Sequence, residues 1–407
     1  MNILMNKITV KLKSTINRYY LYEFLISLHL FSAVLVPFFT DWGGISQGKI
    51  QILQSWFMFW IFILEIPTGA VADYIGRKQS LFIGALFGVI GMLVYGSFPS
   101  FGIFLLAEFL FAAFAAFTSG ANEALLYDAL KEEGKEDQSK KIFGKAHTFH
   151  LLAILIAAPL GSLVASKLGL NFPILLSAIP TFIAAIITLT IKEPKYKSKI
   201  SESKRYINIV KDGFKTLIKN KELRKLTLNS LFVSSAAYFV IWFYQPLLIK
   251  INIPIIYFGF IHSFIVIIEI LISSNFQKIE NFLKGERNYM IFTIISTFLA
   301  FALVGLNTSY VTVILYIIFA GGFGLTYSQY ISAIMQKYIG SEERATVISS
   351  ISMFRRFILV LLNPVMGILA DKNISMALIT VGLISMFSIL FIIKNSLKYN
   401  YVNKNEN

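Results

Sequence analysis

Residues 65–80 read "EIPTGAVADYIGRKQS", and long runs of Phe, Ile, Leu and Trp stand on both sides of this stretch. A Glu, a Pro, two Gly, an Asp, an Arg and a Lys are thus gathered at one junction between apolar segments. Charged residues are costly inside a membrane-spanning segment, so the role of this group of residues has to be explained. That role depends on what the neighbouring segments are.

The composition of the whole chain is that of a membrane protein. Of its 407 residues, 56% are apolar, 15% aromatic and only 14% charged, whereas a soluble globular protein carries roughly 25% charged residues. Apolar runs of about 18 or more residues recur along the chain, and each can cross a bilayer as a helix. The composition predicts an all-α integral membrane protein. The chain has no Cys, which excludes disulfides, thiolate catalysis and Cys-ligated metals.

Hydropathy predicts twelve transmembrane helices with both chain termini on the same side. The predicted spans are 20–39, 51–72, 79–97, 101–127, 144–166, 171–191, 226–249, 254–275, 289–306, 309–335, 346–370 and 374–394.

The basic residues orient these spans in the membrane. Of the 37 Lys and Arg, only Lys49, Lys167, Lys250 and Lys372 fall on the side opposite the N-terminus. The positive-inside rule therefore predicts a multi-pass protein of the cell membrane with both termini cytoplasmic. The net charge of +15 is then mainly a topology signal. It predicts the lipid bilayer, and not nucleic acid, as the partner of the basic surface.

A long basic loop divides the chain into two parts of six spans. We expect a six-helix half at residues 1–191, a cytoplasmic linker at 192–225 and a second six-helix half at 226–407. Apolar residues at helical spacing between Tyr206 and Leu223 predict an amphipathic helix on the cytoplasmic membrane surface.

The two halves carry traces of a repeat at an offset of about 204 residues. Glu65 falls on Glu269, and Pro159 falls on Pro364 to within one residue. Together with the matching number of spans, these positions favour internal duplication. Two six-helix repeats predict a secondary transporter whose halves rock about a central site.

The opening stretch resembles a signature of the major facilitator superfamily. Gly69, Asp73, Gly76, Arg77 and Lys78 match its G-x-x-x-D-x-x-G-R-[RK] motif between spans 2 and 3. The resemblance covers nearly the whole chain and is closest to the twelve-span drug:proton antiporters of the multidrug efflux type. At position 74 the chain departs from the motif, with Tyr where the family usually has Arg or Lys.

The resemblance implies that this motif is a cytoplasmic gate. Asp73 would face the positive N-terminal end of span 11, near Arg344, and Arg77 would pair with Asp128 at the end of span 4. Gly69 would let span 2 approach a neighbouring helix closely. The alternative is an ordinary charged loop that only obeys the topology rule.

Two Pro–Gly pairs resemble a weakened antiporter motif. Pro159 and Gly161 in span 5 fit a Gly-Pro-x-x-Gly-Gly pattern in part, and Pro364 and Gly367 occupy the repeat position in span 11. Pro and Gly bend a helix or permit close packing. Antiport and simple helix packing both remain open from this motif.

Ionisable residues within the spans are candidates for proton or substrate binding. The resemblance places span 4 beside the cavity, so Glu108 is predicted to face substrate and carry a proton, with an ion pair as the alternative. Glu65 and Glu269 either titrate or pair with Arg355 or Arg356. Because consecutive residues point about 100° apart on a helix, the two Arg cannot both face one partner.

Other chemistry is not predicted. His29, His150 and His262 could relay protons or could be packing residues. No metal-ligand spacing, phosphate-binding loop or nucleophile motif occurs in the sequence. We therefore expect no enzymatic activity, no metal and no cofactor, and the proton gradient as the driving force.

The sequence thus predicts a secondary active transporter that works by alternating access. The first candidate is proton-coupled efflux of small amphipathic compounds or drugs, by a chain that functions as a monomer. The alternative is proton-coupled import of a small nutrient or metabolite. A membrane receptor or scaffold without transport is the remote alternative.

Overall fold

The fold is helical throughout the part of the chain that the structure describes. The structure is a computed structural model, and it describes residues 15–132, 134–193, 215, 217, 219–339 and 344–392. In these ranges ten helices are long and apolar enough to cross a membrane, or eleven if the bent helix at 47–75 is one span. The predicted all-α membrane fold is confirmed. The amphipathic helix predicted from Tyr206 lies mostly outside the described residues.

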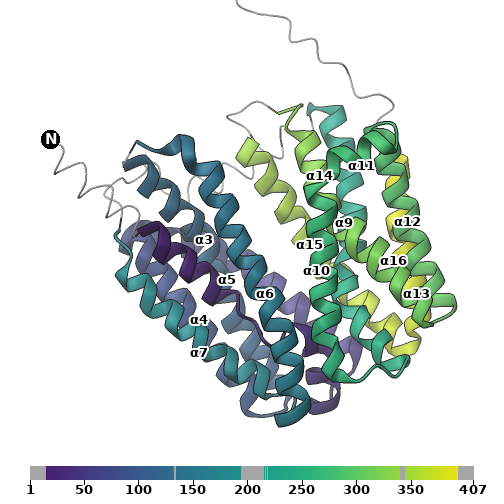
Figure 1. The fold of residues 1–407 in the computed structure, drawn as a ribbon, viewed down its shortest axis with the longest axis horizontal. Coiled ribbons are helices and arrows are strands. Elements are labelled where there is room, and N and C mark those ends of the chain that lie inside the picture. The colour runs from purple at the N-terminus through teal and green to yellow at the C-terminus, as the bar shows by residue number, and fades with distance from the viewer. Residues whose placement is uncertain are drawn as a thin grey trace, which may run out of the picture.

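The helices form two groups that lie side by side in Figure 1. The first group contains residues 15–42, α3 (Gln47–Ile75), α4 (Arg77–Ser97), α5 (Phe101–Glu132), α6 (Ser139–Leu168) and α7 (Phe172–Thr190). The second contains α9 (Lys221–Lys250), α10 (Phe258–Ser274), α12 (Glu286–Leu306), α15 (Arg344–Lys372), α16 (Ile374–Phe387) and one span built from α13 (Tyr310–Leu315), the π-helical η5 (Tyr316–Gly324) and α14 (Leu325–Met335). The short helix α11 (Phe276–Phe282) follows α10.

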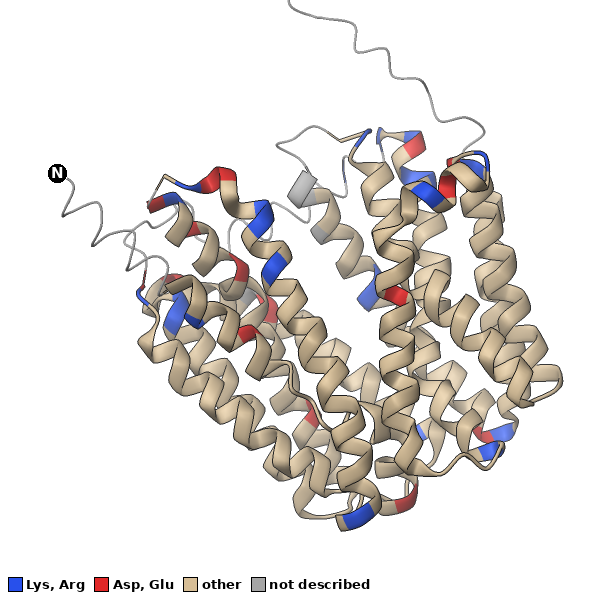
Figure 2. Cartoon of the chain, in the orientation of Figure 1, with Lys and Arg blue, Asp and Glu red and all other residues tan. Residues whose placement is uncertain are grey.

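The bundle has two ends of different charge. We call one the basic end; it is formed by the α3–α4 turn, the α5–α6 connection and the start of α9. The opposite end is formed by the α4–α5, α6–α7 and α9–α10 connections. Figure 2 shows that the charged residues lie mostly at the ends and that more of them lie at the basic end, at the top of the view. Large apolar side chains are exposed on the outward faces of the helices, as expected for contact with lipid.

The first span, predicted as a helix at residues 20–39, is broken in the structure. Residues 15–26 are helical, residues 28–29 have no regular structure, and short 3₁₀, α and π turns follow to Trp42. Side chains from other spans satisfy the backbone at the break. The Leu30 N–H donates to Ser177 Oγ at 3.0 Å, and the Val36 N–H donates to Gln245 Oε1 at 2.9 Å. Irregular backbone is tolerated in a membrane when protein groups pair with it in this way.

Gly161 makes room for this irregular segment. A Cβ added at Gly161 would lie 1.6 Å from the carbonyl oxygen of Leu30, so only glycine permits the contact. The helix α6 runs unbroken through Pro159. Gly161 of the Pro–Gly pair in span 5 therefore packs closely against the first span.

A different proline produces the bend that the structure shows. The helix α3 bends by 47° between Gln47–Glu65 and Pro67–Ile75. Proline lacks the N–H that would continue the helical hydrogen bonds and clashes with the preceding turn, so a kink at this point is expected. The bend separates the part of α3 that packs on α15 from the part that carries the gate motif.

The contact at Gly161 can be tested against a glycine on the same helix. A Cβ added at Gly144, also in α6, meets no atom within 4 Å. Exchange for Ala improves helix propensity by about 1 kcal/mol at either position. We expect Gly144→Ala to keep or raise the Tm, and Gly161→Ala to lower stability by about 1–3 kcal/mol because the first span must move. Thermal unfolding of the purified protein in detergent measures both, and equal Tm changes would contradict the contact.

Candidate functional site

The two halves are closed against each other at the opposite end of the bundle. There α3 and α15 approach so closely that a Cβ added at Gly367 would lie 2.9 Å from the Cα of Gly48. Further along α3 toward the basic end, Ser55 Oγ donates to the Val360 carbonyl oxygen of α15 at 3.0 Å. Small residues permit such an approach, which brings backbone against backbone.

Asp371 ties the halves together at the same end. Its Oδ1 accepts the N–H of Gly48 at 2.8 Å, and its Oδ2 accepts the Ser46 hydroxyl at 2.7 Å. Ser46 is the N-cap of α3 and accepts the Lys49 N–H at 3.3 Å. A carboxylate at a helix N-terminus is favoured by unpaired N–H groups and by the helix dipole. Asp371, at the end of α15, thus stabilises the first turn of α3 in the other half.

The helices α6 and α10 close the other seam between the halves. A Cβ added at Gly259 would lie 2.0 Å from the Ala158 carbonyl oxygen. Ser162 Oγ donates to the Ile256 carbonyl oxygen at 3.0 Å, and Ser263 Oγ donates to that of Leu155 at 3.1 Å. Both seams between the halves are therefore held by glycines and by hydroxyl-to-carbonyl hydrogen bonds.

Two cavities between the halves and one cavity inside the second half lie toward the basic end. Cavity 1, of about 320 Å³, is lined by α6 of the first half and by α9, α10 and α14 of the second. Cavity 2, of about 410 Å³, lies between α3, α5 and α15, and cavity 3, of about 240 Å³, lies between α9, α14 and α15. The halves also lie further apart at this end in Figure 1. The conformation is closed at the opposite end and open toward the basic end.

The gate motif forms a cluster within the first half. Gly76 is the single residue between α3 and α4, with φ at +105°, a backbone conformation that favours glycine. The Arg77 side chain forms an ion pair with Asp128 of α5, and its Nη1 also donates to the Ala124 carbonyl oxygen at 2.7 Å. The expected pairing of Arg77 with Asp128 is therefore present in this conformation.

Glu193 completes this cluster, and sequence reasoning missed it. Its two carboxylate oxygens accept the backbone N–H groups of Arg77 at 2.7 Å and of Lys78 at 2.8 Å. These are the first N–H groups of α4, which have no partner within the helix. Glu193 lies more than a hundred residues along the chain from α4 and just after α7, so no local pattern could have revealed its role.

The other gate residues lie on the open side of the cluster. Gly69 lines cavity 2, and the close helix approach expected at this residue stays a prediction. Asp73 lies in the last turn of α3. Its predicted partner region at residues 340–343 and the side chain of Arg344 lie outside the described part of the chain. The contact between Asp73 and the start of α15 therefore stays a prediction.

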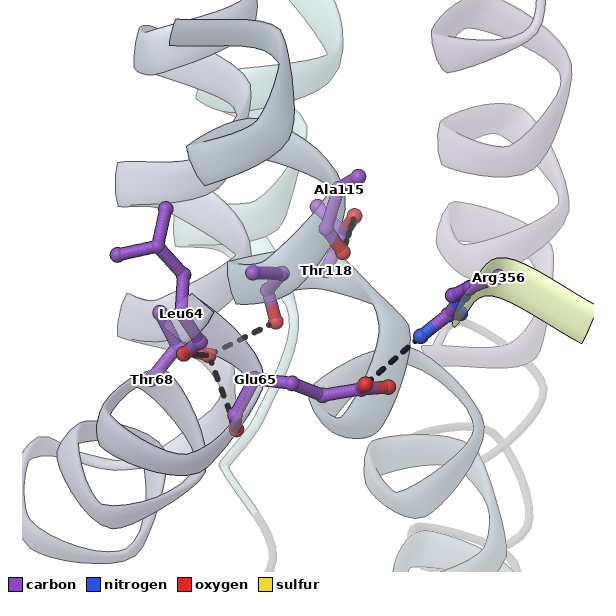
Figure 3. A network of polar contacts seen from close by, with 7 residues as sticks. Leu64, Glu65, Thr68, Ala115, Thr118 and Arg356 are labelled. Carbon is purple, nitrogen blue, oxygen red and sulfur yellow. Dashed lines mark hydrogen bonds and ion pairs between the residues drawn. The ribbon is translucent and has the colours of Figure 1, made fainter. Parts of the chain in front are cut away.

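Glu65 and Arg356 form an ion pair between the two halves. Figure 3 shows the Arg356 side chain of α15 reaching Glu65 of α3, with Nη1 and Oε2 2.7 Å apart. The side chains are 16% exposed for Glu65 and 26% for Arg356, and both residues line cavity 2. Arg355 lines cavity 3 instead. The two consecutive Arg thus face different surroundings, as helical geometry requires.

Glu108 is buried inside the first half. Its residue is 6% exposed, and Gln54 Nε2 of α3 donates to its Oε1 at 2.8 Å. It does not line any of the three cavities described above. The prediction that Glu108 faces the cavity therefore does not hold for this conformation, because α5 turns this side chain toward α3.

Glu269 lies with histidines in cavity 1. His147, His150 and His262 line the same cavity, and the fourth histidine of the chain, His29, is an electrostatic neighbour of His150. The rings of His147 and His150 stack with centroids 5.8 Å apart.

Hydrogen bonds connect these histidines to the first span and to α9. Ser27 Oγ lies 2.8 Å from His150 Nδ1, and Tyr244 Oη lies 3.0 Å from His262 Nδ1. Within the described residues no group of three or more His, Asp or Glu is arranged to hold a metal ion. The cluster therefore offers proton-binding groups around one carboxyl group.

Two six-helix halves that enclose cavities and are closed at one end define a membrane transporter of the alternating-access class. The chain belongs to the Major Facilitator Superfamily, whose profile matches residues 24–361. No curated protein sequence matches the chain.

Solved structures share the fold at low sequence identity. The nucleoside transporter NupG is 17% identical with a TM-score of 0.76, over 93% of this chain and 97% of that chain. The peptide transporter POT in complex with sulfate is 13% identical with a TM-score of 0.69, over 93% of each chain. These likenesses support the fold and carry no statement about substrate.

The role of Asp371 can be measured with a single introduced Cys, since the chain has no Cys of its own. Ser55 of α3 faces α15 and is 9% exposed. It is exchanged for Cys, and a water-soluble maleimide can reach this Cys when the opposite end opens. A carboxylate cap stabilises the closed contact by about 1 kcal/mol, which is about five-fold in the opening equilibrium. We therefore expect Asp371→Ala to raise the labelling rate about five-fold. Asp41→Ala is the control, because Asp41 lies near the same end and accepts a hydrogen bond from its neighbour Thr40. Equal rates in the two variants would exclude a latch at Asp371.

The ion pair between Glu65 and Arg356 can be measured by a double-mutant cycle. The variants are Glu65→Gln, Arg356→Gln and the double variant, each followed by thermal unfolding in detergent. Because both side chains keep some contact with water, we expect a coupling energy of about 1–2 kcal/mol. A coupling energy near zero would show that the pair contributes nothing to holding the halves together.

Proposed function

We propose that this member of the superfamily is a proton-coupled secondary transporter that exports small amphipathic compounds. The observation that carries the proposal is the arrangement of cavities lined by both halves and closed at one end, as alternating access requires. With the basic end taken as cytoplasmic under the positive-inside rule, this conformation is open to the cytoplasm. One chain contains both halves, so we expect a monomer in the cell membrane to be sufficient.

The lining of cavity 1 supports an amphipathic substrate. Aliphatic side chains such as Ile154, Val240 and Ile265 share the cavity with Glu269 and three histidines. A mostly apolar wall with a few polar groups is typical of small-molecule sites. Such a wall suits a compound with an apolar body and one polar group.

Glu269 is the carboxyl group best placed to carry the coupling proton. A coupling group must meet water from one side and then from the other during the cycle. Glu269 lines an open cavity, whereas Glu65 is paired with Arg356 and Glu108 is bonded to Gln54.

Transport and its direction are tested together in proteoliposomes. The purified chain is reconstituted, a pH gradient is imposed, and movement of a panel of lipophilic cations and neutral amphipathic compounds is followed. Export predicts that a compound moves against the direction of proton flow. Accumulation along with protons would establish the importer instead, and no movement under either gradient would reject transport.

The coupling role of Glu269 predicts a specific loss of function. Glu269→Gln removes the titrating group, so we expect the pH gradient to lose its effect by at least ten-fold while exchange of substrate across the membrane continues. Glu65→Gln and Glu108→Gln are measured in the same assay. Lost coupling in Glu108→Gln with coupling kept in Glu269→Gln would assign the proton to Glu108.

A further inference from the structure

A cluster of buried polar atoms lies where α3, α9 and α15 meet. Both amide atoms of Gln51 and of Asn363, the hydroxyl of Tyr238 and the indole N–H of Trp242 are buried without a hydrogen-bond partner in the described part of the protein. Gln51 and Asn363 are both 0% exposed. We call these four residues the polar cluster.

The four side chains converge on one place. At Gly367 of α15, an added Cβ would lie 2.9 Å from the Cβ of Gln51, and Asn363 lies one turn earlier on the same face of α15. Asn363 and Trp242 are the polar neighbours of the Tyr238 hydroxyl, although neither reaches hydrogen-bond geometry. The rings of Tyr238 and Trp242 have centroids 6.4 Å apart. Both halves of the transporter therefore contribute to the cluster.

The polar cluster lies between the closed end and an open cavity. On the closed side, Gln47 Nε2 donates to the backbone carbonyl of Trp242 at 3.1 Å. On the other side, Ser234 and Arg355, which precede the cluster on α9 and α15, line cavity 3. The polar cluster thus lies between cavity 3 and the contact of Gly48 with Gly367, next to the layer in which Ser55 and Val360 also join α3 to α15.

The chemistry of the cluster selects for an uncharged ligand. Each carboxamide offers an acceptor oxygen beside an NH₂ donor in one plane, and the phenol and indole add further donors. None of the four side chains is ionised. Two charged residues, Glu108 and Arg355, act on Tyr238, and their charges have opposite signs. An ion of either sign would therefore meet one like charge, so the surroundings do not favour an ion.

We propose that the polar cluster is the substrate subsite of this transporter and that it takes an uncharged planar compound carrying a hydrogen-bond donor beside an acceptor. The proposal rests on the transport function proposed above and specifies its substrate class. Buried polar atoms without partners destabilise a protein, and a ligand with a complementary edge would satisfy them. The flat faces of Tyr238 and Trp242 would pack against its ring.

Binding to the full-length protein in detergent tests this assignment. The uncharged probes are nicotinamide, uridine and adenosine, and the matched charged probes are nicotinate and 1-methylnicotinamide. Titration calorimetry is expected to give saturable binding of at least one uncharged probe. For nicotinamide, the Kd is expected to be at least ten-fold lower than for its two charged analogues. Gln51→Leu and Asn363→Leu are each expected to raise the Kd of the bound probe at least ten-fold.

A control and a stability measurement separate binding from folding. Gln138→Leu exchanges an exposed glutamine in the α5–α6 connection and is expected to leave the Kd unchanged. Because Gln51→Leu and Asn363→Leu remove unpartnered polar atoms, we expect the Tm without ligand to stay the same or rise.

Three results would each overturn the assignment. They are unchanged affinity in both variants, tighter binding of the charged analogues, and no binding of any uncharged probe. Proton-driven transport that persists alongside such a result would leave the transport function standing. Probe binding that depends on the polar cluster, without transport under either pH gradient, would reject transport and keep the binding site.

Discussion

The close contact between α3 and α15 at the opposite end of the bundle is the constraint on which the rest of the structure depends. Gly48 and Gly367 bring the two backbones together, and Asp371 of one half holds the first turn of α3 in the other. Because the halves are fixed to each other at this end, they can separate only toward the basic end. The cavities, the position of Gly69 at cavity 2 and the placement of Glu269 in cavity 1 all follow from that arrangement.

Several of the decisive polar contacts satisfy backbone groups that a helix leaves unpaired. Asp371 and Glu193 accept N–H groups at the starts of α3 and α4, and Gln245 accepts one at the break in the first span. The N–H at the break lies within the membrane, where it has no water to bond with. The predicted contact of Asp73 with the start of α15 has the same chemistry as that of Asp371 with α3. A transporter that exchanged one contact for the other would change which end is closed at small net cost.

Three carboxyl groups in the membrane illustrate how far sequence reasoning reaches. Glu65, Glu108 and Glu269 were all recognisable as intramembrane acids from hydropathy alone. The structure gives them different surroundings: an ion pair with Arg356, an amide hydrogen bond from Gln54 and a cavity shared with histidines. A side chain's surroundings depend on the rotation and neighbours of its helix, and hydropathy does not encode either.

The sequence by itself determined the class of fold and placed the charged motif of residues 69–78 between two spans. It could do so because membrane thickness, positive charge and a Gly-Asp-Gly-Arg spacing are local or additive signals. The pairing of Arg77 with Asp128 was also predictable, since the family resemblance supplied the geometry.

Only the tertiary structure decided the break in the first span, the roles of Glu193 and Asp371, and the approach of Gln51 to α15 at Gly367. Each of these joins residues separated by more than a hundred positions. Their proximity results from how whole helices pack, which a one-dimensional pattern of residues cannot express.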